Sequence, residues 1–210
     1  MHALVIANGE APSRQLLTKL GNAAGFIVAA DGGAAHALAA GLVIDAVVGD
    51  LDSVTAAVRR ALPAERFHRD ADPERTDLQK AISFCIAQGA ATVDVAAAGG
   101  GRPDHALANL SVLRLFRAQA VVRVIDDYFE VSLIEGQATV DAPIGTVVSL
   151  IAIGQATGVT TTGLRWNLTD YPLAFSPHGI HNEVVDSPAR IYVAEGDVLL
   201  FCGRWVEKHA

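Results

Sequence analysis

Apolar runs and amphipathic runs alternate along the first half of the chain. Short apolar segments bounded by glycine or polar residues predict buried strands at 3–7, 26–30, 46–48, 91–98 and 120–125. Between them, apolar residues spaced three and four apart predict helices at 13–20, 34–40, 54–62, 77–89 and 106–116. Strands that alternate with helices in this way predict a parallel sheet with right-handed crossovers.

The pattern changes near Tyr128. Helical spacing disappears after this point, and short β-rich runs follow, separated by Gly, Pro, Asn and Asp. Many short strands with turn residues between them predict a sandwich or a barrel. We therefore expect the α/β fold class, with an N-terminal parallel-sheet domain at 1–127 followed by a C-terminal all-β sandwich domain at 128–210.

Carboxylates gather between the third predicted strand and the helix that begins at Asp77. They include Asp50, Asp52, Asp70, Asp72, Glu74 and Asp77. Asp50 and Asp52 follow a buried strand directly, and open α/β sheets bind ligands at the carboxyl ends of their strands. Because neighbouring carboxylates repel one another, a hard cation among them would stabilise the group, and Mg²⁺ takes oxygen ligands together with substrate phosphates. The pattern favours a magnesium–nucleotide site; a solvated acidic loop before a helix capped by Thr76 is the alternative.

Glycine-rich turns follow two other predicted strands. Asp31-Gly32-Gly33 follows one of them, and Gly99-Gly100-Gly101-Arg102-Pro103-Asp104-His105 follows the other. Glycines there let backbone N–H groups approach a phosphate or a sugar, and the start of the next helix favours an anion. Arg102 adds a cation that suits phosphate oxygens, and Asp104 suits a metal ligand or a helix N-cap. An ordinary tight turn is the alternative for Asp31-Gly32-Gly33.

Composition narrows the possible partners and location. Hydrophobic residues make up 51% of the chain, which is enough for a sizeable core, and the net charge of −7 argues against a nucleic-acid groove and an anionic membrane surface. Cys85 and Cys202 lie in apolar patterns and are expected in the core rather than in a disulfide. The chain enters a strand at once and has no apolar run of membrane-spanning length, so we expect a cytoplasmic protein.

The order of these motifs, together with two later ones, resembles that of a known enzyme family. The matching stretches are Ala30–Ala34, Gly49–Ser53, Thr76-Asp77, Gly100–His105, Gly163–Leu168 and Asn182-Glu183. On these stretches the chain resembles the thiamine pyrophosphokinase (thiamine diphosphokinase) family along nearly its whole length. The resemblance implies an ATP-binding catalytic α/β domain, a β-sandwich domain that helps to hold thiamine, and a homodimer with shared active sites. It also implies transfer of a diphosphate from ATP to the thiamine hydroxyl, with release of AMP.

The resemblance further implies a role for each candidate residue. Mg²⁺ on the ATP phosphates would be held by Asp72, Glu74, Asp77 and Asp104. The nucleotide would contact Asp31, Gly32, Gly33, Asp50, Asp52, Ser53, Thr76, Arg102 and His105. Arg102 would neutralise the charge that develops as AMP leaves, and either Asp77 or Asp104 would accept the hydroxyl proton. Thiamine would contact Asn109, Trp166, His181, Asn182 and Phe201.

The chain departs from the family pattern at two places, and two other functions stay open. Glu74 stands where the family usually has an aspartate, and His181-Asn182 stands where it often has Ser-Asn. The alternatives are a diphosphokinase for another heterocyclic alcohol, such as a hydroxymethylpterin, and a non-catalytic nucleotide or thiamine sensor. The complete set of carboxylates argues against a sensor.

Overall fold

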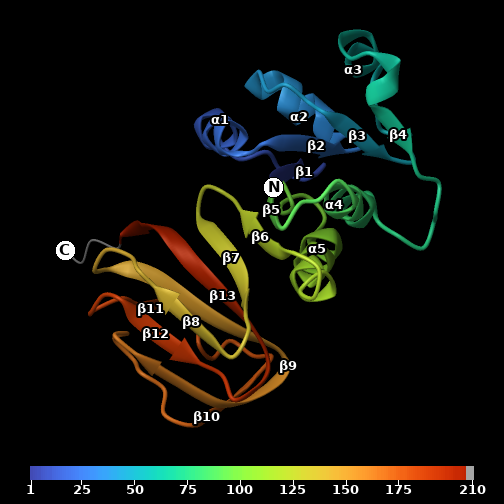
Figure 1. Ribbon diagram of the computed structural model, residues 1–210. Helices are drawn as coiled ribbons and strands as arrows, with labels where there is room; N and C mark the ends of the chain where they lie inside the picture. The colour runs from blue at the N-terminus through green and yellow to red at the C-terminus, as the bar shows by residue number, and fades with distance from the viewer. Residues whose placement is uncertain (207–210) are drawn as a thin grey trace. The chain divides into compact units, whose positions relative to one another are not determined.

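The computed structural model describes residues 1–206. The chain divides into two compact units, residues 1–127 and residues from Tyr128 onward. The first unit combines strands with helices, and the described part of the second consists of strands, turns and loops (Figure 1). The mixed α/β fold class expected from the sequence is confirmed. Residues 207–210 of the expected second domain lie outside the described residues.

The first unit is built on a parallel sheet. Its strands lie in the order β4-β3-β2-β1-β5-β6, and every pair in this series is parallel. The strands are β1 (His2–Ile6), β2 (Phe26–Ala30), β3 (Ala46–Gly49), β4 (Phe67–Arg69), β5 (Thr92–Ala96) and β6 (Val121–Ile125). The sequence did not predict β4, because this three-residue edge strand has no buried residue and so no apolar run marks it.

The helices of the first unit begin and end at residues with a clear physical role. They are α1 (Arg14–Ala23), α2 (Gly33–Ala40), α3 (Ala56–Ala61), α4 (Asp77–Ala87) and α5 (Pro103–Leu115), with a short 3₁₀ helix, η1 (Ala64–Arg66). The side chains of Ser13, Thr55 and Thr76 accept hydrogen bonds from the first turns of α1, α3 and α4. The cap expected at Thr76 is confirmed, and it forms a capping box with Gln79. Gly41 ends α2 in the left-handed conformation that glycine adopts readily.

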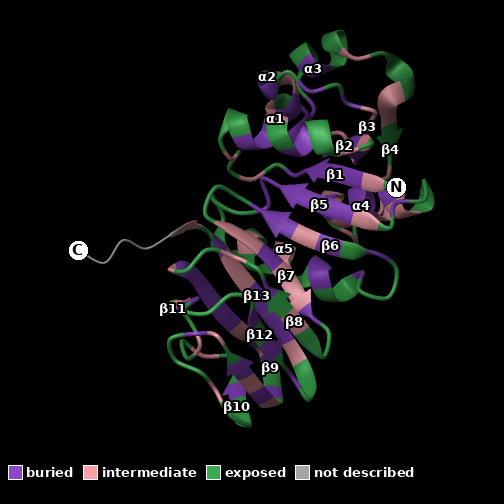
Figure 2. Ribbon diagram, turned by 60° about the vertical axis from the view of Figure 1, so that its left-hand side comes forward, coloured by how far each residue is buried: buried purple, intermediate pink, exposed green. Residues whose placement is uncertain are grey.

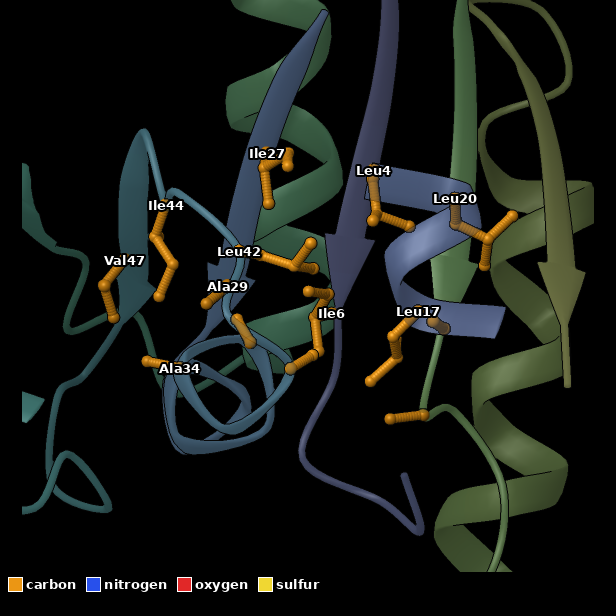
Figure 3. Packing of buried hydrophobic residues seen from close by; sticks show 14 of the residues in the cluster. Leu4, Ile6, Leu17, Leu20, Ile27, Ala29, Ala34, Leu42, Ile44 and Val47 are labelled. Atoms are coloured by element: carbon orange, nitrogen blue, oxygen red, sulfur yellow. The ribbon is translucent and has the colours of Figure 1, made fainter. Parts of the chain in front are cut away.

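Side chains from alternate positions of the strands form the core on the two faces of this sheet. Leu4 and Ile6 of β1 meet Leu17 and Leu20 of α1 on one face (Figure 3). Val5, at the position between Leu4 and Ile6, is fully buried as well, and α4 contacts the same strand. Figure 2 shows β1 and β5 buried along most of their length. This double coverage is typical of parallel sheets and explains why their strands appear in the sequence as continuous apolar runs.

The second unit is an antiparallel β structure organised around one long strand. Its strands are β7 (Phe129–Ile134), β8 (Gln137–Val140), β9 (Thr146–Thr162), β10 (Tyr171–Ala174), β11 (Asn182–Glu183), β12 (Ala189–Tyr192) and β13 (Glu195–Val206). β9 pairs with β10, β11, β12 and β13, while β7 pairs with β13 and β8 with β12. β9 continues as one strand through Gly154 and Gly158, which adopt positive φ without ending it.

A second core lies within this unit. Val148, Leu150 and Val159 of β9 pack with Ile191 of β12 and Leu200 of β13. β10 was not predicted from the sequence, because only one of its four residues is buried.

Candidate functional site

A cavity of about 1030 Å³ lies in the first unit. Its lining residues come from the turns that follow the parallel strands: Ala7–Glu10 after β1, Asp31 after β2, Asp50 and Ser53 after β3, and Ala98 with Gly100–Arg102 after β5. The loop before α4 and the first turns of α4 and α5 complete the lining. This is the edge at which open α/β sheets bind ligands.

Three carboxylates meet in this cavity. Oxygens of Asp31, Asp50 and Asp77 lie within 4.8 Å of one another. Asp31 is only 3% exposed. Its Oδ2 accepts a hydrogen bond from the Ser53 N–H at 3.1 Å, but its buried Oδ1 has no hydrogen-bond partner among residues 1–206. A buried carboxylate oxygen without a donor is costly, and a bound cation would offset that cost.

The electrostatics of Asp31 reflect this arrangement. Burial raises the pKa of Asp31 above its ordinary value, and the charges of Asp77, Asp50 and Asp52 raise it further. The Ser53 hydrogen bond acts in the opposite direction and lowers this pKa. Burial and the neighbouring carboxylates therefore disfavour the charged form of Asp31, and a bound cation would offset both effects.

Gly49 at the end of β3 makes this close approach possible. A Cβ at this position would lie 2.9 Å from the Asp77 Oδ1 and 3.0 Å from the Asp31 Cβ. The Asp77 Oδ1 also accepts a hydrogen bond from the Asp50 N–H at 3.2 Å. The backbone of the turn after β3 thus fixes Asp77 beside Asp31 and Asp50.

Lys80 is a cavity residue that sequence reasoning missed. Its side chain is 3% exposed, and its Nζ lies 3.0 Å from the Asp77 Oδ1. The spacing from Asp77 places both residues on one face of α4. A lysine between apolar positions of a helix is commonly exposed, so the burial of Lys80 could be found only in the structure. The β1–α1 turn supplies three more lining residues that the sequence did not single out: Asn8, Gly9 and Glu10.

Arginine binds the carboxylates of the loop before α4. Arg75 places Nη2 2.7 Å from the Asp70 Oδ2 and Nε 2.8 Å from the Asp72 Oδ2. The Arg75 hydrogen bond lowers the pKa of Asp72. Asp72 and Arg75 line the cavity, whereas Glu74 is exposed and does not. Of the four carboxylates expected to hold a metal, only Asp77 belongs to the acidic cluster.

The glycine-rich loop before α5 carries a second arginine–carboxylate pair. Arg102 Nη2 lies 2.6 Å from the Asp104 Oδ2, and both side chains are largely exposed. This hydrogen bond lowers the pKa of Asp104 to about 2. Arg102 and His105 line the cavity but Asp104 does not, and the N-cap position of α5 is Arg102 rather than Asp104. Asn109 also lines the cavity, and its Nδ2 donates to the Ala98 carbonyl at 2.8 Å.

The glycines after β2 have a packing role. A Cβ on Gly33 would lie 2.1 Å from the Ile6 carbonyl oxygen, and a Cβ on Gly32 would lie 2.5 Å from the side-chain Nδ2 of Asn8. These glycines let the start of α2 lie directly on the end of β1. Neither glycine lines the cavity, and Asp52 does not either.

In the second unit, the expected thiamine contacts fall into two groups. Trp166 and Asn182 are hydrogen-bonded to each other, and the Trp166 side chain is 58% exposed. His181, beside Asn182, has φ of +57° and donates its backbone N–H to the Ser149 Oγ at 2.9 Å. Phe201 packs edge-on against Phe129, with 5.8 Å between the ring centroids.

The fold and the site define an α/β protein with a metal-compatible acidic site at the strand ends of a parallel sheet. Comparison with protein families identifies the family to which the chain belongs. The chain belongs to the thiamin pyrophosphokinase family: the family's catalytic domain matches residues 17–125, and its vitamin B1 binding domain matches residues 134–197.

Individual relatives agree with this assignment. Thiamine pyrophosphokinase 3 of Oryza sativa subsp. japonica is 32% identical over 146 residues, which are 62% of this chain and 54% of the rice protein. The chain spans 54% to 64% of the length of three rice relatives. Thiamine pyrophosphokinase of Bacillus subtilis (strain 168) is 25% identical over 182 residues, which are 82% of this chain and 85% of that protein.

Solved structures share the fold. The thiamine pyrophosphokinase of Bacillus subtilis superposes with a TM-score of 0.84 at 22% identity, over 97% of this chain and 99% of that one. The thiamin pyrophosphokinase of Candida albicans gives a TM-score of 0.84 at 15% identity, over 98% of this chain and 89% of that one. Among the residues that the structure describes, no helix has both the length and the apolar character needed to cross a membrane.

Proposed function

We propose that the protein is a thiamine diphosphokinase, which transfers a diphosphate from ATP to the thiamine hydroxyl and releases AMP. The observation that carries this proposal is the cluster of Asp31, Asp50 and Asp77, which lines the cavity and lies within the match to the family's catalytic domain. The match to a vitamin B1 binding domain supports thiamine as the acceptor, ahead of a pterin alcohol. The acidic cluster itself supports catalysis ahead of a sensor, because a binding module does not require it.

We propose that Mg²⁺ is held by Asp31, Asp50 and Asp77. The unpartnered Oδ1 of Asp31 and the mutual approach of the three carboxylates support this set. Asp72, the other cavity carboxylate of the expected set, is engaged by Arg75 and would join only after that ion pair opens. Bound Mg²⁺ neutralises negative charge on the phosphates of ATP.

The residues around the cluster suit the polyphosphate. Lys80, Arg75 and Arg102 line the cavity and supply positive charge, and positioning with charge neutralisation does most of the work in phosphoryl transfer. In the proposed reaction the thiamine oxygen bonds to the β-phosphorus, and the bond from that phosphorus to the oxygen bridging it to the α-phosphate breaks. AMP leaves with the bonding electrons. Asp77 is the proposed acceptor of the hydroxyl proton ahead of Asp104, because Asp77 lines the cavity and Asp104 does not.

We further propose how the two units divide the work. Residues 1–127 would be the ATP-binding catalytic domain, with Asp31, Asp50, Ser53, Thr76, Arg102 and His105 at the nucleotide. Residues 128–210 would be a β-sandwich domain that binds thiamine, with Trp166, His181 and Phe201 as the proposed contacts, and Asn109 of the first unit would be a further contact. We also propose a cytoplasmic homodimer. Size-exclusion chromatography with light scattering tests the assembly.

Product analysis tests the activity. The protein is incubated with ATP, Mg²⁺ and either thiamine or a hydroxymethylpterin, and the products are measured by mass spectrometry. We expect thiamine diphosphate and AMP, no product from the pterin, and loss of turnover with EDTA. Asp77→Asn should lower the rate by orders of magnitude, because it removes a metal-binding charge while keeping the shape. ADP with thiamine monophosphate would disprove diphosphate transfer, and binding without turnover would favour the sensor.

A further inference from the structure

The Asn182 side chain in the second unit is hydrogen-bonded to the backbone of Trp166. Its Oδ1 accepts a hydrogen bond from the Trp166 N–H at 3.1 Å, and its Nδ2 donates to the Trp166 carbonyl at 2.7 Å. The same Oδ1 accepts from the Glu183 N–H at 2.9 Å. An amide oxygen has two lone pairs, so these bonds use its full acceptor capacity. Asn182 thus has one amide hydrogen left for any ligand.

Further contacts fix the loop at 163–168 on both sides of Trp166. On one side, Arg165 donates its backbone N–H to the Glu183 carbonyl at 2.9 Å, and its Nη2 lies 2.8 Å from the Glu183 Oε2. Glu183 is 3% exposed, which anchors this ion pair in the protein. On the other side, the Asn167 Oδ1 accepts from the Leu164 N–H at 3.2 Å. The backbone that carries Trp166 is therefore held by contacts with Asn182, Glu183 and Asn167.

Trp166, which this backbone carries, is 58% exposed. The Arg165 guanidinium carbon lies 5.8 Å from the centroid of the Trp166 ring, within the range of a cation–π contact. A large aromatic side chain on an ordered backbone loses little conformational entropy when a flat ligand stacks on it. An exposed tryptophan held in this way is suited to recognise a flat ring.

We propose that Asn182 is a positioning residue: it holds Trp166 as a rigid stacking platform for the heteroaromatic ring of the acceptor and does not itself bind the acceptor. The inference rests on the proposed function for the identity of the acceptor. It changes the role expected for Asn182 from the sequence, where it was placed among the thiamine contacts. Trp166 provides the contact, and Asn182 provides its orientation.

Fluorescence of Trp166 tests the positioning role without any substrate. The chain has two tryptophans, so Trp205→Phe leaves Trp166 as the single emitter. In that background, Asn182→Ala should lower the fluorescence anisotropy of Trp166 and raise its quenching by acrylamide, because both hydrogen bonds to its peptide groups are lost. Asn22→Ala, on an exposed position of α1, is the matched control and should change neither signal. Unchanged anisotropy in a folded Asn182→Ala protein would overturn the proposal.

Steady-state kinetics separate positioning from direct contact. Asn182→Ala should raise the KM for thiamine about tenfold, the effect of losing two hydrogen bonds of ordinary strength, with little change in kcat. Asn182→Asp keeps the hydrogen-bond acceptor and loses the donor. Its KM for thiamine should therefore lie between those of the unmodified protein and Asn182→Ala. In a Trp166→Ala background, Asn182→Ala should have no further effect, because the group that it positions is gone.

The outcomes of the two experiments are distinguishable. Additive effects of Asn182→Ala and Trp166→Ala on KM would show that Asn182 contacts the acceptor directly, and would overturn the proposal. If the unmodified protein does not turn over thiamine, the proposed function fails, while the anisotropy of Trp166 still tests the positioning role. If Asn182→Ala does not fold, Asn182→Asp carries both measurements.

Discussion

At the scale of single residues, Asp31 shows the conflict between stability and function most directly. It is 3% exposed, has φ of +45°, and has one oxygen without a hydrogen-bond partner in the described part of the chain. Each of these features opposes folding. They are understandable if Asp31 is placed for a cation that joins the site after folding. Residues of this kind are commonly stabilised by substitution at the expense of activity.

Asp31→Asn tests this conflict. The pKa of Asp31 is raised in the folded state, so the folded state favours the protonated carboxyl. The ionised carboxylate therefore lowers the free energy of unfolding. This loss of stability develops as the pH rises through the pKa of the unfolded state and then that of the folded state. In metal-free buffer near neutral pH, Asp31→Asn should raise Tm by roughly 2–4 °C, equivalent to about 1 kcal/mol. The gain should vanish at acidic pH, where Asp31 is protonated in both states.

Calorimetry across this pH range measures the effect, and Asp186→Asn, at an exposed position, is the control. The same Asp31→Asn variant should bind Mg²⁺ more weakly by titration calorimetry. A loss of Tm at neutral pH together with unchanged Mg²⁺ binding would show that Asp31 is a structural residue.

At the scale of elements, the start of α4 connects helix formation with the site. The Thr76 side chain accepts a hydrogen bond from the Gln79 N–H and so fixes the turn that carries Asp77 and Lys80. Thr55 makes the corresponding bond to the Val58 N–H at the start of α3, outside the cavity lining. The two caps have the same chemistry, but only the Thr76 cap lies beside a residue of the acidic cluster, Asp77.

We therefore predict a separation between stability and activity. Thr76→Ala and Thr55→Ala should each lower the free energy of unfolding by about 1 kcal/mol, measured by urea denaturation. Only Thr76→Ala should also lower the rate, by about tenfold or more, because a small displacement of Asp77 disturbs the acidic cluster. Thr76→Ser, which keeps the hydroxyl, should retain both the free energy of unfolding and the rate of the unmodified protein. Equal loss of activity in the two alanine variants would contradict this interpretation.

Much of the arrangement of elements could be predicted because apolar periodicity reports burial. The strands that are covered on both faces, such as 26–30, appear as apolar runs, and Thr76 marks the start of α4 by its capping chemistry. The edge strand β4 has no buried residue, and β10 has one, so periodicity does not reveal them.

The site was predictable only in part, because charge pairing depends on tertiary contacts. Asp50 and Asp77 stood out in the carboxylate-rich stretch, but their grouping with Asp31 depends on the pairing of β2 with β3. Sequence position could not show that Arg75 engages Asp72, or that Asn182 is occupied by the Trp166 backbone. Local motifs identify the residue types at a site, whereas the fold decides which of them face one another.

At the scale of the whole molecule, the candidate site residues are divided between two units with separate cores. The cavity with the acidic cluster is lined by residues of the first unit, and the Trp166–Asn182 pair lies in the second. The proposed diphosphokinase site would need both groups. The proposed homodimer would satisfy this need if the second unit of one subunit served the first unit of its partner.

Subunit mixing tests that arrangement. Asp77→Asn protein is mixed with Trp166→Ala protein, each shown to be folded and inactive alone at low thiamine. If sites form between subunits, each mixed dimer has one site with both lesions and one with neither. Random exchange makes about half of the dimers mixed, so about a quarter of all sites should be active. Native mass spectrometry confirms the exchange, and its occurrence without recovered activity would show that each site is formed within one chain.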